Sequence, residues 1–251
     1  MRYLIISDIH GNWEALRGVL NHVRRKRYDR IAFLGDAVGY GASPNLVVGW
    51  LRSLGPSAVA VRGNHDRVCS GIDIADYFNR YAREACTWTL ERLEARNLEY
   101  LRSMTPGPIA LSDELAIYHG SAIDEDTYVF SAYDAHIAFE ALPHRVMFFG
   151  HTHVPSLFEL RATAGGQELD VKLLSGRRVV VDLDPGHRYM INPGSVGQPR
   201  DRDPRASYAI YDTEQHRLYL YRANYRVAMA RRRILQAGLP PVLGDRLLYG
   251  A

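Results

Sequence analysis

The sequence predicts an α/β protein with a parallel β-sheet and helices on both of its faces. Two observations predict this fold class. Short apolar runs rich in isoleucine and valine alternate with segments of helical spacing between residues 3 and 61, and each run is closed by a glycine or a polar residue. The order strand, helix, strand, helix, strand favours parallel strands joined by helical crossovers.

The first three strands and two helices have clear boundaries in the sequence. Buried strands are expected at Tyr3–Ser7, Ile31–Leu34 and Ala58–Val61. Asn12 is suited to cap the helix that follows the first strand, because its side-chain oxygen can accept a backbone N–H of the first turn. Ser43, followed by a proline, is typical of a second helix start.

The rest of the chain predicts a helical insertion and then more strands. Asp76 to Met104 is helical in pattern, and a later helix, Asp134–Leu142, separates strands at Leu115–His119 and Val146–Phe149. After Pro155 shorter strands alternate with Gly and Pro turns; these are Leu157–Arg161, Leu169–Leu174, Val179–Leu183, Tyr189–Ile191, Ser207–Tyr211 and Leu218–Tyr221. No linker is long enough to divide the chain, so we expect one domain over residues 1–251.

Composition indicates an ordinary soluble chain: 47% of the 251 residues are hydrophobic and 24% are charged. No apolar run approaches the roughly 18 residues that span a bilayer, and the N-terminal segment does not resemble a signal peptide. Cys69 and Cys86 are too few for a disulfide framework and are expected to be reduced thiols in a cytoplasm.

The net charge of +3 is too small to imply a nucleic-acid partner. The densest basic cluster, Arg231–Arg233, is predicted to be the solvated face of a terminal amphipathic helix. We therefore expect neither a membrane nor a nucleic-acid partner, and the sequence leaves the oligomeric state open.

Metal-capable side chains follow five of the predicted strands. They are Asp8 and His10, Asp36, Asn64, His119, and finally His151 and His153. One His-x-His pair alone indicates only two polar residues on the same face of a strand. Five strand ends together predict a site, because ligands bind outside the carboxyl ends of parallel strands. The set suits two ions sharing a carboxylate, and mixed carboxylate and imidazole ligands favour Mn, Fe, Zn or Ni over Ca or Mg.

These motifs, in this order, resemble the calcineurin-like metallophosphoesterases. The resemblance implies a two-sheet β-sandwich flanked by helices, with a dinuclear metal site at the carboxyl ends of the strands. Among the metals that suit these ligands, manganese is the first candidate. It assigns Asp8, His10, Asp36 and His153 to one ion. It assigns Asp36, Asn64, His119 and His151 to the other, with Asp36 bridging.

His65 matches the histidine of this family that is not a metal ligand. The resemblance implies attack by a metal-bridging hydroxide, with His65 as the general acid that protonates the leaving alkoxide. Asp66 follows directly and is predicted to hold the His65 ring and keep it cationic.

Four further residues are candidates for weak substrate contacts. Asn12 is one, although helix capping explains it equally well. Gly194 and Ser195 could offer backbone N–H groups to an anion, and Arg200 could reach a phosphate. The segment that contains Gly194, Ser195 and Arg200 is explained equally well as a plain turn between strands.

Departures from the family pattern point to the small bacterial phosphodiesterase branch. No arginine follows Asp36, and the third motif ends in Asp66 instead of glutamate. We therefore expect a small phosphate ester or nucleotide substrate, with diesters favoured and Gly39 and Gly41 leaving room for a second substituent. The alternatives are a phosphomonoesterase or a protein or nucleotide phosphatase. A non-catalytic scaffold is disfavoured because all the ligands are present.

Overall fold

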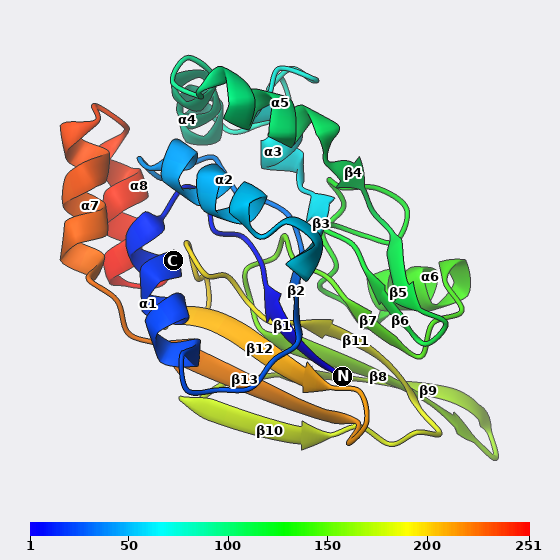
Figure 1. Ribbon diagram of the computed structural model, residues 1–251. Coiled ribbons are helices and arrows are strands. Elements are labelled where there is room, and N and C mark those ends of the chain that lie inside the picture. The colour runs from blue at the N-terminus through cyan, green and yellow to red at the C-terminus, as the bar shows by residue number, and fades with distance from the viewer.

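Two β-sheets face each other in the computed structural model, which describes residues 1–251, and helices cover the outer face of each sheet (Figure 1). The first sheet has the order β10 (Arg178–Asp182), β13 (Arg217–Ala223), β12 (Ala206–Asp212), β1 (Arg2–Ile6), β2 (Arg30–Phe33), β3 (Ala58–Arg62) and β4 (Thr105–Pro106). The second has the order β5 (Ile109–Ser112), β6 (Leu115–Ile117), β7 (Val146–Phe148), β11 (Arg188–Asn192), β8 (Ser156–Thr163) and β9 (Gly166–Leu173). The expected two-sheet α/β fold is confirmed.

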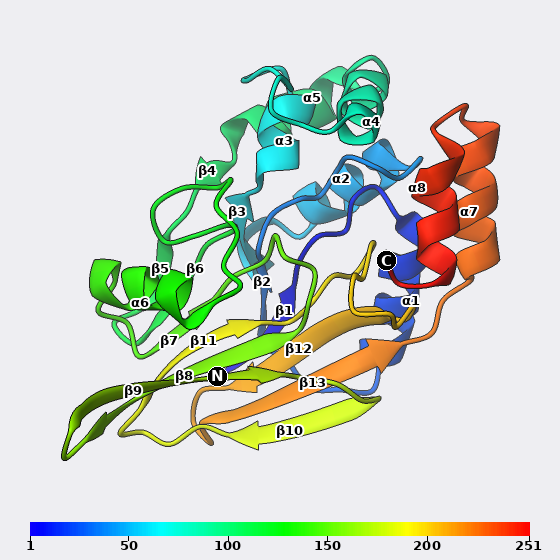
Figure 2. The same ribbon diagram turned by 180° about the vertical axis from the view of Figure 1, so that it is seen from behind.

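The helices form groups around these sheets. Their bounds are α1 (Trp13–Val23), α2 (Pro44–Ser53), α3 (Asn64–Cys69), α4 (Arg80–Leu90), α5 (Ala95–Ser103), α6 (Ala132–Ala141), α7 (Val227–Gln236) and α8 (Pro241–Asp245). Helices α1, α2, α7 and α8 lie beside the first sheet, whereas α6 lies on the far side of the second sheet (Figure 2).

Three apolar clusters lie between these layers. On β1, Leu4 and Ile6 belong to the cluster under the helices, while Tyr3 and Ile5 belong to the cluster between the sheets. On β6, Ile117 belongs to the cluster between the sheets, whereas the residues before and after it in the chain belong to the cluster under α6. Each central strand is therefore buried on both faces, which explains why these strands read as nearly continuous apolar runs.

The prediction of one parallel sheet was wrong in two respects. Strand β1 pairs in parallel with β2 but antiparallel with β12, a strand from the end of the chain. Strands β6 and β7, which were expected in the same sheet as β1, β2 and β3, belong to the second sheet. A buried apolar run has the same pattern in either sheet, so periodicity could not assign the partners.

The helical insertion is present as α4 and α5, but short elements around it were missed. The strands β4 and β5 follow α5 in a segment interrupted by prolines. Helix α3 spans six residues, too few for a helical period to emerge from the sequence.

The C-terminal arginines only partly match their prediction. Arg232 is exposed as expected. Arg231 Nε lies 2.7 Å from Asp245 Oδ1, and Arg233 Nε lies 2.6 Å from Glu14 Oε1. Two of the three arginines therefore tie α7 to α8 and α1. None of the helices has the length and apolar character that crossing a membrane requires.

Candidate metal centre

The loops after five strands, three in the first sheet and two in the second, meet at one edge of the sandwich. Two groups of ligand atoms form there, each with all atoms within 4.8 Å of one another. The first group contains Asp8, His10, Asp36 and His153; the second contains Asp36, His119 and His151. Asp36 belongs to both groups, as the predicted bridging carboxylate requires.

In the first group the imidazole nitrogens face one another and the carboxylates. His10 Nε2 lies 3.0 Å from His153 Nε2 and 3.5 Å from Asp36 Oδ2. His153 Nε2 lies 3.3 Å from Asp8 Oδ1. Two imidazole nitrogens at such a short separation fit two ligands of a single cation.

In the second group His119 is central. Its Nε2 lies 3.3 Å from Asp36 Oδ2 and 3.3 Å from Asn64 Oδ1. The His151 ring lies beside it, with the two ring centroids 5.0 Å apart. The structure therefore brings Asn64 to the place where the sequence predicted it.

The backbone at these positions is unusual. Five of the seven predicted ligands have positive φ angles: Asp8 54°, His10 50°, Asp36 60°, His151 67° and His153 61°. Such angles cost non-glycine residues of order 1–3 kcal/mol each and tend to gather at functional sites. The sharp turns they produce point consecutive side chains into one small volume.

Backbone carbonyls orient three of the rings. The Nδ1 atoms of His10, His119 and His153 lie 3.0, 2.7 and 2.6 Å from the carbonyl oxygens of Val38, Leu34 and Gln198. An Nδ1–H bonded to a carbonyl leaves the Nε2 lone pair free for a metal. His151 has the opposite arrangement, because its Nε2 lies 3.0 Å from the Asp126 carbonyl oxygen.

The unsatisfied oxygen atoms fit a pair of cations. Asp8 Oδ2 and Asp36 Oδ2 are buried and have no hydrogen-bond partner, a situation that calls for an ion or another explanation. Burial favours the neutral form of Asp8, but the charge and hydrogen bond of His153 outweigh it and lower the Asp8 pKa. Burial also lowers the pKa of His119, yet Asp36 raises it to about 10. Both effects come from attraction between a carboxylate and the positive form of the histidine beside it.

Asp66 does not hold the His65 ring, which corrects the prediction. Its carboxylate accepts hydrogen bonds from the backbone N–H groups of Asp36 (2.8 Å), Gly63 (3.1 Å) and Val38 (3.2 Å). On helix α3, consecutive residues point in different directions, so Asp66 turns toward the loop after β2. The Asp66 carboxylate therefore fixes the backbone around Asp36.

The His65 ring instead contacts a cysteine that the sequence did not suggest. His65 Nδ1 lies 3.5 Å from Cys86 Sγ, and its Nε2 has no hydrogen-bond partner within the chain. The His65 backbone N–H donates to Asp36 Oδ1 at 2.9 Å, which links His65 to the two groups of candidate ligands. No local pattern could reveal the Cys86 contact, because the two residues are 21 positions apart.

Three of the weak substrate candidates are engaged within the protein. Asn12 Oδ1 accepts from Ala15 N at 3.0 Å, so it is the helix cap, and Asn12 Nδ2 donates to Gly197 O at 2.8 Å. The Gly194 N–H donates to Asn192 Oδ1 at 2.8 Å. The Ser195 hydroxyl donates to Asp8 O at 2.8 Å. These bonds give Asn12, Gly194 and the Ser195 hydroxyl structural roles, and the Ser195 bond supports the backbone at Asp8.

Arg200 is the weak candidate that keeps an available donor. Its Nη2 donates to Gln198 Oε1 at 3.1 Å, while its buried Nε has no partner. Its charge is close enough to lower the pKa of His153, after the larger effect of burial.

A cavity of about 220 Å³ adjoins the cluster. Its lining consists of Tyr40, Asn64, His65, Tyr77, Phe78, Asn79, Ala82, Asp126, Tyr128 and His151, with no lysine or arginine. Tyr128 stacks on the His151 ring with centroids 3.9 Å apart. No sequence motif surrounds Tyr128, so it was not identified as a site residue from the sequence.

The glycines after Asp36 do not provide the room that was expected. A Cβ on Gly39 would lie 2.4 Å from His65 Nδ1, and one on Gly41 would lie 2.3 Å from the His10 carbonyl oxygen. The space at these glycines is filled by the protein itself, so they allow close packing of the loop against the site residues.

Residues 1–216 match the family model of the "Calcineurin-like phosphoesterase superfamily domain". The chain therefore belongs to the calcineurin-like phosphoesterase superfamily, in agreement with the geometry of the site. Over 254 aligned residues it is 35% identical to an uncharacterised protein of Methanocaldococcus jannaschii, covering 98% of this chain and 97% of that protein.

Among solved structures, a metallophosphoesterase from Sphaerobacter thermophilus shares 40% identity and a TM-score of 0.85, with all of both chains covered. A symmetrical bis(5'-nucleosyl)-tetraphosphatase of Psychromonas ingrahamii is 36% identical over only 67 residues, which are 26% of this chain and 24% of that protein.

Proposed function

We propose that the protein is a dinuclear, manganese-dependent hydrolase of phosphate esters that prefers phosphodiesters. The convergence of carboxylates and imidazoles around the shared Asp36 carries the proposal. Two bound divalent ions would supply an activated water and neutralise phosphate charge. The seven predicted ligands would hold these ions. Free thiols at Cys69 and Cys86 support a reducing compartment such as the cytoplasm.

His65 is proposed as the proton donor for the leaving alkoxide. Its ring lines the cavity, and its Nε2 is free of protein partners. The 2.9 Å hydrogen bond from its backbone N–H to Asp36 Oδ1 supports this role, because it keeps the start of α3 close to the proposed bridging carboxylate. A general acid needs this combination of proximity and an available proton.

The cavity lining supports a diester substrate. A monoester dianion carries one more negative charge than a diester, and sites that select it add arginines. Arg67 follows His65 by two residues, but its guanidinium group is held in ion pairs. It contacts Glu125 and Asp126 at 2.7 Å each and Asp73 at 3.1 Å. Aromatic side chains instead form much of the cavity wall and suit an organic second substituent.

Arg200 favours a second candidate, a phosphomonoesterase. Its unpartnered Nε could add the positive charge that a monoester needs. The short similarity to a bis(5'-nucleosyl)-tetraphosphatase supports a nucleotide as the substrate of such an enzyme.

The test compares bis-nitrophenyl phosphate with nitrophenyl phosphate, using kcat/KM for the manganese-loaded protein. We expect the diester to be the better substrate. A clear preference for the monoester would overturn the diester proposal, and Arg200→Gln should then reduce monoester hydrolysis more than diester hydrolysis. Absence of hydrolysis with every ester and divalent ion tried would favour a binding scaffold.

A further inference from the structure

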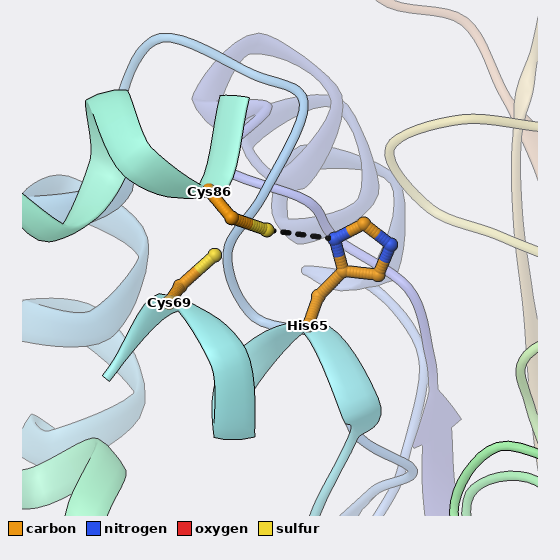
Figure 3. A group of neighbouring side chains, drawn as sticks. All are labelled: His65, Cys69 and Cys86. Carbon is orange, nitrogen blue, oxygen red and sulfur yellow. Dashed lines mark hydrogen bonds between the residues drawn. The ribbon is translucent and has the colours of Figure 1, made fainter. Parts of the chain in front are cut away.

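A second cluster of metal-capable side chains lies beside the candidate centre, and the proposed reaction uses its histidine but neither of its two cysteines. It consists of His65 and Cys69, one turn apart on α3, and Cys86 on the adjacent α4; their side chains point toward one another (Figure 3). Their ligand atoms all lie within 4.8 Å of one another. The residues are 5%, 0% and 2% exposed, so the cluster is enclosed.

The spacing fits tetrahedral coordination. Zinc binds a cysteine sulfur at about 2.3 Å and a histidine nitrogen at about 2.05 Å, which places the two donors about 3.6 Å apart in a tetrahedron. The separation between His65 Nδ1 and Cys86 Sγ is 3.5 Å. The i, i+4 spacing of His65 and Cys69 puts both on one face of α3.

The charge balance also fits. A buried site tolerates an ion only if its charge is compensated. Two thiolates and one neutral imidazole around a divalent cation give a complex with no net charge. The paired centre offers carboxylates and imidazoles without sulfur, so the two sites differ in the metals that they select.

One thiol is already disposed to ionise. Burial raises the pKa of Cys86, but the hydrogen bond with Cys69 and the nearby His65 outweigh it and lower the value to about 6. Burial raises the pKa of Cys69, so that thiol would lose its proton only to a bound metal.

We propose that His65 Nδ1, Cys69 Sγ and Cys86 Sγ form a third metal site, selective for a thiophilic divalent ion such as Zn²⁺ or Cd²⁺. Two metal–sulfur bonds and one metal–nitrogen bond form, and protons still held by the thiols pass to solvent. The fourth position is left for water or another donor. His65 borders the substrate cavity, and Cys86 borders a second cavity of about 600 Å³, so both openings approach the site.

Occupation of this site inhibits hydrolysis, a consequence that rests on the proposed role of His65 as general acid. The Nδ1 lone pair would be committed to the ion, so the ring could no longer be an imidazolium. A metal-bound neutral imidazole holds its Nε2 proton much more tightly. The bound ion would therefore prevent His65 from protonating the leaving alkoxide, without displacing either metal of the paired centre.

Binding is tested by adding Cd²⁺ to the manganese-loaded protein and recording thiolate-to-metal charge-transfer absorption in the near ultraviolet. The chain has two cysteines, both in the cluster, so the band reports this site even if Cd²⁺ also enters the paired centre. We expect a saturable band in the wild-type protein, with an amplitude that corresponds to one Cd²⁺ bound by the two thiolates. Its absence there would overturn the proposal, whether or not the protein hydrolyses esters.

Variants identify the ligands. Loss of an outer-shell partner weakens metal binding by about 10–100-fold, so Cys69→Ala and Cys86→Ala, which lose a direct ligand, should weaken the band's Cd²⁺ affinity by at least about tenfold. Thr89→Val, a change of similar shape on α4, is the matched control and should keep the wild-type band. Equal Cd²⁺ affinity in the wild type and both alanine variants would contradict the site.

Inhibition is tested with Zn²⁺, each protein being normalised to its own rate without zinc. We expect Cys69→Ala to resist zinc by at least about tenfold relative to the wild type, because it loses a ligand but keeps the hydrogen bond between Cys86 Sγ and His65 Nδ1. Identical inhibition of both proteins would show that zinc acts elsewhere. A protein that gives the band but hydrolyses no ester would refute the proposed function and leave the metal site standing.

Discussion

Asp36 is the residue on which both proposed ions depend. Its Oδ2 lies 3.5 Å from His10 Nε2 on one side and 3.3 Å from His119 Nε2 on the other. We predict that Asp36→Asn weakens both ions together, whereas Asp8→Asn mainly weakens one. Metal analysis after dialysis measures this as ions per chain. An Asp36→Asn protein that keeps one ion at wild-type affinity would argue against a bridging role.

His65 gives a second prediction at the residue scale. His65→Ala should retain the paired metals but lower turnover by about 10²–10⁴-fold, equivalent to about 3–5 kcal/mol of barrier. The loss should be smaller for a nitrophenyl ester than for an alkyl ester, because a good leaving group needs less protonation. An equal loss on both esters would instead assign His65 to phosphate binding.

The sequence identified residues of the site better than their contacts. The glycine-flanked ends of the strands located Asp8, Asp36 and the other proposed ligands, because their spacing is local. The predicted hydrogen-bond partner of the His65 ring was wrong. Asp66 is the next residue along the chain, but its carboxylate accepts hydrogen bonds from backbone N–H groups. Cys86 reaches it from another helix, and such a contact depends on packing that no local pattern records.

At the scale of elements, Glu159 on β8 links neighbouring strands of the second sheet. Its carboxylate lies 3.0 Å from Lys172 Nζ on β9, 3.0 Å from Tyr189 OH on β11 and 2.8 Å from His187 Nδ1. Burial raises the Glu159 pKa, but these hydrogen bonds outweigh it and lower the value to about 2.

We predict that Glu159→Gln lowers the free energy of unfolding at pH 7 by about 1.5–3 kcal/mol, the contribution of hydrogen bonds to a charged group. Because the folded pKa is depressed, this stabilisation is present above the unfolded pKa of about 4.3 and is lost as pH falls toward the folded value of about 2. Denaturant titrations at several pH values should show the two proteins converging between about pH 5 and 2. A difference that stays constant over this range would exclude the carboxylate as its cause.

Element positions were more predictable than element pairing. The expected strand at Leu157–Arg161 lies within β8, and the one at Ser207–Tyr211 lies within β12. That β12 would join β1 could not be foreseen, because the pairing joins the two ends of the chain and depends on the assembled first sheet.

At the scale of the whole molecule, the candidate centre joins the two sheets. Asp8 and Asp36 follow strands of the first sheet, whereas His119, His151 and His153 follow strands of the second. Ions held by this set would therefore connect both halves of the sandwich. Five of the proposed ligands have positive φ angles, which destabilise the folded backbone at these positions. Bound ions would offset this cost.

Metal binding should consequently raise the stability of the entire fold. A ligand at a concentration 100 times its Kd stabilises the folded state by about 2.7 kcal/mol, which corresponds to roughly 5–10 °C in Tm for a chain of this size. We predict that adding Mn²⁺ to chelator-treated protein shifts one unfolding transition upward by about this amount for each ion, and that Asp36→Asn loses most of the shift. Calorimetry measures both effects. Two separate transitions, of which one ignores the metal, would contradict the prediction of a single domain, because ions that tie the sheets together must stabilise both sheets at once.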